Sequence, residues 1–147
     1  MQTVNTGVNN ADPNKKMSYR FFLFMSFMIW LIATLVIRFW GETFFVPDSN
    51  VSMIASFLFS VFFLPPLAYS LFAWQNIEPV QRKDAAICLA IPGMLLDALT
   101  NYFFPYFFPN LPDAANGVFG AWLLWGYAIV LITGIFTSQW KKWVIGN

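Results

Sequence analysis

Two ionisable residues, Arg38 and Asp97, lie inside long stretches of otherwise apolar sequence. A charge at the centre of a membrane helix costs about 2.5 to 3.5 kcal/mol on insertion scales, so such a residue must be paired, neutral or facing water. Glu42 follows Arg38 by one helical turn and would share its face if the helix continues that far. We therefore take Arg38, Glu42 and Asp97 as a candidate intramembrane polar cluster.

Asp97 has three interpretations. At about 1.5 Å per residue, Asp97 and Arg38 lie about 20 Å and 25 Å from the starts of their apolar segments, a difference that an arginine side chain can span. The first hypothesis is an ion pair with Arg38, for which Glu42 competes; removing one partner would then cost more than removing both. The second is a carboxylate that couples movement of a proton or substrate. The third is an acid hydrogen-bonded to Thr100, Asn101 or a neighbouring helix.

The common catalytic residue sets are missing from the sequence. There is no histidine, which removes His-ligated haem, His-rich metal sites and Ser-His-Asp or Cys-His nucleophiles. The single cysteine, Cys88, forms no internal disulfide and holds no iron–sulfur cluster. We predict no catalytic, cofactor-binding or metal site, and no enzymatic activity.

The composition indicates an integral membrane protein. Of 147 residues 59% are apolar and 10% are charged, whereas soluble domains carry about 25% charged residues. Eight Lys and Arg against seven Asp and Glu leave no broad basic surface, so nucleic acid is not an expected partner.

Four segments are long enough to cross a membrane, which needs about 20 mostly apolar residues. We predict an all-α, polytopic membrane protein in which four transmembrane helices form a bundle. Residues 1–18 are polar and rich in Asn, which predicts a disordered tail, and residues 19–147 form the transmembrane domain. The predicted spans are about residues 21–40, 51–74, 84–104 and 118–140.

The positive charges predict the orientation. Seven of the eight Lys and Arg residues flank one side of the four spans, and by the positive-inside rule that side is the cytoplasm. We therefore expect a multi-pass protein of the plasma (inner) membrane with both termini cytoplasmic. Interfacial anchors are expected in the last of these flanks, at Trp140, Lys141, Lys142 and Trp143.

Prolines and a glycine interrupt two of the spans. Pro65 and Pro66 lie in the second and Pro92 and Gly93 in the third, one turn before Asp97. Each proline removes an amide donor and clashes with the preceding turn, so we expect helix breaks at these positions. Such breaks line substrate sites in some transporters, but they also simply shape helix packing.

Four motifs stand out in the sequence: "RFWGE" (38–42), "PGMLLDA" (92–98), "FPNLP" (108–112) and "FGAWLLWGYA" (119–128). Together they resemble a family of small four-helix bacterial membrane proteins classed as a domain of unknown function. The resemblance extends over about residues 20–140, and it implies a bacterial plasma-membrane protein with no assigned activity. Arg38, Asp97 and the prolines of the third motif fall on positions that stand out in that pattern.

Two functions remain open from the sequence. The first is a structural or accessory protein that binds membrane lipids or a membrane partner, as a homo-oligomer or within a larger membrane complex. The alternative is an oligomeric small transporter or channel subunit that uses Asp97 for proton or substrate coupling. The sequence indicates no ligand for either function.

Overall fold

The computed structural model describes residues 17–45 and 49–145, with side chains up to residue 139. Four helices are long and apolar enough to cross a membrane, and no strand occurs within these ranges. The prediction of an all-α protein with four spans is thus confirmed. The long helices are α1 (Tyr19–Phe44), α2 (Asn50–Trp74), α3 (Arg82–Tyr102) and α5 (Asn116–Ile145); the short ones are η1 (Pro79–Gln81), α4 (Phe104–Phe107) and η2 (Asp113–Ala115).

Two of the sequence predictions fall where the structure gives little or no description. The predicted tail, residues 1–18, lies outside the described residues except for its last two positions. The predicted anchors continue the backbone of α5, but their side chains lie outside the described residues. These anchors are Trp140, Lys141, Lys142 and Trp143.

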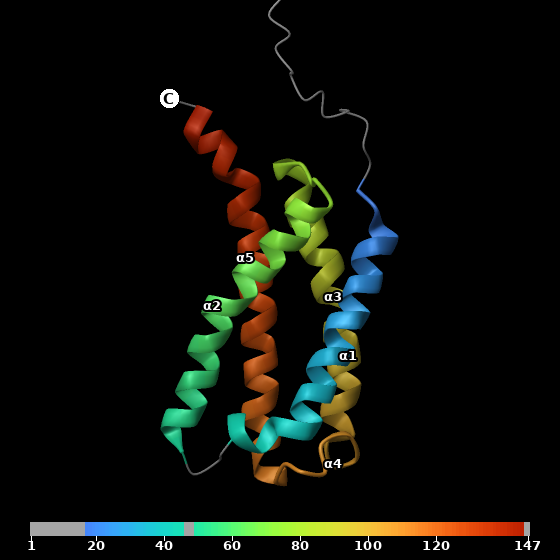
Figure 1. The fold of residues 1–147 in the computed structure, drawn as a ribbon, viewed down its shortest axis with the longest axis vertical. Helices are drawn as coiled ribbons and strands as arrows, with labels where there is room; N and C mark the ends of the chain where they lie inside the picture. Colours follow the sequence, from blue (N-terminus) through green and yellow to red (C-terminus); the bar gives the residue numbers. More distant parts are fainter. Residues whose placement is uncertain (1–16, 46–48, 146–147) are drawn as a thin grey trace, which may run out of the picture.

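The long helices pack in a row, in the order α2, α5, α3, α1. Helix α3 packs extensively against α1 and α5, and α5 packs against α2, whereas the consecutive helices α1 and α2 touch only slightly. Figure 1 shows that α1 begins and α5 ends at the same end of the molecule. We call this the terminal end. The opposite end, which holds α4, we call the connector end, and the connector is residues 103–115.

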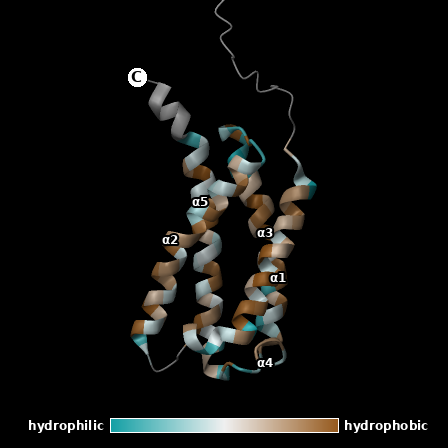
Figure 2. Cartoon of the chain, in the orientation of Figure 1, coloured by the Kyte–Doolittle hydropathy of each residue, from teal (hydrophilic) through white to brown (hydrophobic). Residues whose placement is uncertain are grey.

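The exposed surface is mainly apolar, as a lipid-facing surface must be. Large apolar side chains are exposed along all four long helices, including Phe62 on α2 and Ile32 on α1. In Figure 2 hydrophobic residues follow the lengths of α1 and α2, and hydrophilic residues gather in the turns at both ends. Soluble proteins rarely leave apolar patches this large uncovered.

The helices continue through all of the predicted helix breaks. Helix α2 runs without interruption through Pro65 and Pro66, and α3 runs through Pro92 and Gly93. Near Pro92 a neighbouring helix also bonds to the backbone of α3: Ser26 Oγ of α1 donates to the Leu89 carbonyl at 2.6 Å.

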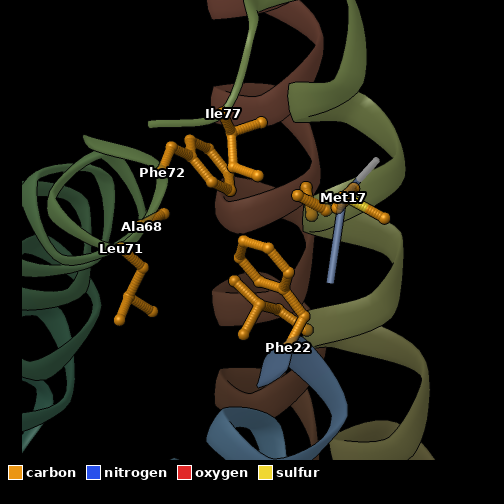
Figure 3. Close-up of a cluster of buried hydrophobic side chains, with 9 residues drawn as sticks. Met17, Phe22, Ala68, Leu71, Phe72 and Ile77 are labelled. Carbon is orange, nitrogen blue, oxygen red and sulfur yellow. The ribbon is translucent and has the colours of Figure 1, made fainter. Parts of the chain in front are cut away.

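At the terminal end a glycine-free turn joins α2 to α3. Asn76 adopts the left-handed conformation with φ 51°, the Ile77 amide donates to the Phe72 carbonyl, and the Asn76 amide donates to Ala73. These bonds form a Schellman motif, in which residues such as Ile77 and Phe72 make an apolar contact. Both side chains are buried, and Figure 3 shows them with Phe22 of α1 pointing toward the same space.

Candidate functional site

Small residues allow α3 and α5 to approach closely. Gly120, Tyr127 and Gly134 recur every seven residues on α5 and so occupy one face of the helix. A Cβ placed on Gly134 would collide with Ala86 of α3, and one placed on Gly93 of α3 would lie 2.6 Å from Tyr127 Oη. Close packing through small residues is a usual basis of helix association in membranes.

Asp97 lies in this interface and is hydrogen-bonded to α5. Its side chain is buried, and Tyr127 Oη donates to Asp97 Oδ2. The Thr100 hydroxyl and the Asn101 amide both donate to the backbone carbonyl of Asp97 at 3.0 Å. The Trp30 indole of α1 lies beside the carboxyl, but its buried Nε1 makes no hydrogen bond of ordinary geometry within the described chain.

The predicted ion pair between Arg38 and Asp97 is wrong. Both residues lie in the described part of the chain and no ion pair joins them; instead Arg38 Nη1 donates to the backbone carbonyls of Tyr106 at 3.1 Å and Phe107 at 2.7 Å. These carbonyls end the short helix α4, where the backbone leaves acceptors without helical partners. Of the three interpretations of Asp97, the structure shows hydrogen bonding to a neighbouring helix.

Arg38, Glu42 and Asp97 therefore do not form one cluster. Arg38 and Glu42 are exposed near the connector end of α1, whereas Asp97 is buried between α3 and α5. Their separation has a physical reason: the depths estimated from sequence are compatible with contact, but the rotation of each helix about its axis places Asp97 toward Tyr127. Backbone carbonyls of the connector accept the hydrogen bonds of the Arg38 guanidinium instead.

Two of the sequence motifs meet where the connector docks on α1. Asn110 Nδ2 donates to the Ile37 carbonyl at 3.3 Å. A Cβ placed on Gly41 would lie 3.3 Å from the Leu111 side chain, so the glycine lets the connector approach α1 closely. Thus "RFWGE" and "FPNLP", which are far apart in the sequence, form one packed contact that includes Arg38.

Helix α2 is tied to α5 by indole groups. Trp122 Nε1 donates to the Ser56 carbonyl at 3.1 Å, and Trp125 Nε1 donates to the Phe57 carbonyl at 3.3 Å. Ser56 and Ser60 are buried on this face of α2, which agrees with the role of small residues in close helix approach.

Two residues of the Asp97 site were missed in the sequence. Tyr127 carries a recoverable signal, because its spacing of seven from Gly120 and from Gly134 places all three on one helix face. Trp30 carries none, since an aromatic residue within an apolar span is equally consistent with lipid contact. Within the described residues, no three His, Cys, Asp or Glu side chains come together as a metal site would require.

The fold and these contacts define an α-helical, multi-pass membrane protein whose buried polar groups join its helices. The chain belongs to a family of unknown function, DUF5367, whose model matches residues 44–142. The match thus includes α2 to α4 and most of α5, while most of α1 with "RFWGE" lies outside it. No curated protein and no solved structure matches the chain.

Proposed function

We propose that this protein is a structural or accessory component of the membrane that binds lipid or a membrane partner through its two edge helices. One observation carries the proposal: α1 and α2 stand at the ends of a row of helices, and each packs extensively on one neighbour only. In a closed bundle each helix has two such neighbours. The open edges leave a whole side of α1 and of α2 available to lipid, a second copy or another membrane protein.

The exposed side chains on these edges support this role. Ile32 on α1 is 61% exposed and Phe62 on α2 is 76% exposed. Phe59 and Phe63 of α2 stack with ring centroids 5.4 Å apart and are both exposed. Stacked aromatic rings present a broad, rigid apolar surface that costs little side-chain entropy to bury.

Photo-crosslinking tests the role of the edges. A photoreactive residue at Ile32 or at Phe62 should give a discrete protein adduct of constant mass or a retained lipid. Leu95 of α3 is the matched control, because it is 66% exposed but lies on an inner helix of the row. If Leu95 gave the same adducts as the edge positions, or if all three positions gave none, the edges would have no special role.

The membrane and orientation belong to the same proposal. Of the four cations whose side chains are described, Arg20, Arg82 and Lys83 lie at or near the terminal end, which supports a cytoplasmic location for both termini. In a Cys88→Ser background, cysteine at Asp113 should react with an impermeant maleimide in intact cells. Cysteine at Glu78 should stay unlabelled, and the reverse pattern would overturn this orientation.

A second candidate function is an oligomeric transporter or channel subunit that uses Asp97 for coupling. The observation that favours it is the position of the Asp97 carboxyl, buried deep in the helices beside the Tyr127 hydroxyl and the Trp30 indole N–H. Intramembrane carboxylates with neighbouring donors serve in proton and substrate pathways. Proton flux into liposomes should then fall in Asp97→Asn; equal flux would exclude Asp97 from coupling.

A further inference from the structure

Two opposite charges, Arg38 and Glu42, occupy the last turns of α1 at the connector end without pairing with each other. Both are exposed, and no ion pair joins them although they stand one helical turn apart. Arg38 uses only Nη1, which is fixed by the connector carbonyls. Its Nε and Nη2 make no hydrogen bond to any described residue, and the Glu42 carboxylate likewise has no described partner.

The free guanidinium edge of Arg38 and the Glu42 carboxylate together complement a ligand that carries one negative and one positive charge. The Nε and Nη2 edge of a guanidinium matches two oxygens of a phosphate. Four residues further along α1, about 6 Å nearer the connector end, the Glu42 carboxylate can accept hydrogen bonds from an ammonium group. Because the connector carbonyls hold the guanidinium, little side-chain entropy is lost when a phosphate binds.

The surroundings place this pair at the level of lipid headgroups. Trp40, near the same end of α1 as Arg38, is 62% exposed, and Tyr106, whose carbonyl accepts from Arg38, is 80% exposed. Exposed Trp and Tyr at the ends of membrane helices lie at the membrane–water interface. A phospholipid of the adjoining leaflet can reach both charges at that level.

We propose that Arg38 and Glu42 bind the headgroup of a phospholipid that carries a primary ammonium, as in phosphatidylethanolamine. Arg38 binds the phosphate, and Glu42 accepts from the ammonium a few bonds beyond it. A choline headgroup has no N–H to donate, and a glycerol headgroup offers no cation to Glu42. This inference rests on the proposed lipid-binding function and names its lipid class.

Native mass spectrometry of the full chain tests the inference. Protein in mild detergent receives an equimolar mixture of phosphatidylethanolamine, phosphatidylcholine and phosphatidylglycerol with identical acyl chains. Wild type should retain phosphatidylethanolamine in excess. In Glu42→Gln the ratio of phosphatidylethanolamine to phosphatidylglycerol should fall about threefold, as expected for one exposed charge contact. Arg38→Gln should lower retention of all three lipids, because each has a phosphate.

The controls separate the site from general effects. Glu78→Gln makes the same chemical change on an exposed residue at the terminal end and should leave the ratio unchanged. If Glu42→Gln matched Glu78→Gln, the headgroup assignment would be overturned while lipid binding itself remained. If no lipid were retained, the lipid-binding role would fail as well. Displacement of the lipid by excess soluble glycerophosphoethanolamine would reassign the site to a free phosphate ester.

Discussion

Replacing Gly93 with alanine tests whether the Tyr127 hydroxyl occupies the space in front of that glycine. An ideal Cβ at position 93 would lie 2.6 Å from Tyr127 Oη, 3.1 Å from Cε1 and 3.2 Å from Cζ. The ring is rigid and its hydroxyl is held by Asp97. The new methyl group must therefore separate α3 from α5 or turn Tyr127 away from Asp97.

The expected change in the free energy of unfolding for Gly93→Ala is the sum of three contributions. Overpacking in a well-packed interface costs about 1–3 kcal/mol, and a lost interhelical hydrogen bond in a membrane protein costs about 0.6 kcal/mol on average. The gain in helix propensity from Gly to Ala returns up to about 1 kcal/mol. With the full gain in propensity, we expect Gly93→Ala to lower the free energy of unfolding by about 0.6–2.6 kcal/mol.

Unfolding of the purified protein in mixed detergent micelles by increasing sodium dodecyl sulfate measures this difference. Gly117→Ala is the matched control, because nothing lies within 4 Å of a Cβ at that position of α5; it should be neutral or stabilise by up to about 1 kcal/mol through helix propensity alone. Tyr127→Phe removes the hydroxyl and with it the closest contact. In that background Gly93→Ala should cost about 1 kcal/mol less than in wild type.

Two outcomes would refute this reasoning. If Gly93→Ala and Gly117→Ala had equal effects, the space in front of Gly93 would be open. If Gly93→Ala cost the same with Phe as with Tyr at position 127, the hydroxyl would not be the group that fills it.

Three further outcomes follow from the same contacts. Gly134→Ala should destabilise more than Gly93→Ala in the same unfolding assay, because its Cβ would lie 3.0 Å from a backbone carbonyl of α3, which cannot rotate away. The decreases in the free energy of unfolding caused by Arg38→Gln and by Asp97→Asn should add to within about 0.5 kcal/mol in the double variant. This is expected because the two side chains share no contact. Ser26→Ala should cost about 0.6 kcal/mol through loss of its interhelical hydrogen bond, whereas Ser70→Ala, which loses only a bond within α2, should cost less.

The spans could be predicted because the bilayer fixes both their length and their polarity. The ends were less predictable. Helix α1 continues through Gly41 to Phe44, beyond the predicted end at residue 40, and Leu111 of the connector packs on that glycine. Helix α2 begins at Asn50, where the Ser49 side chain accepts from the Ser52 amide. A cap of this kind is local, whereas the contact at Gly41 depends on residues far along the chain.

The Asp97 site was only partly predictable, for a reason of geometry. Depth in the membrane follows from counting residues along a span, and α1 and α3 are in fact parallel neighbours. The rotation of a helix about its axis has no such measure when apolar residues surround it on all sides. Asp97 could thus be placed in depth, but its partner Tyr127 on α5 could not be chosen over Arg38 on α1.

Helix α3 shows which sequence property does indicate position in the row. It has the largest share of buried residues among the four spans, and its buried residues are mostly small or polar, including Ala86, Ala90, Gly93 and Asp97. In a soluble protein the most buried helix is usually the most apolar. Lipid tails are as apolar as leucine, so burial in a membrane instead favours residues that pack closely or hydrogen-bond. In this chain the least hydrophobic span is thus the most buried one, and substitutions on its small residues should disturb the fold more than substitutions on the aromatic residues that face lipid.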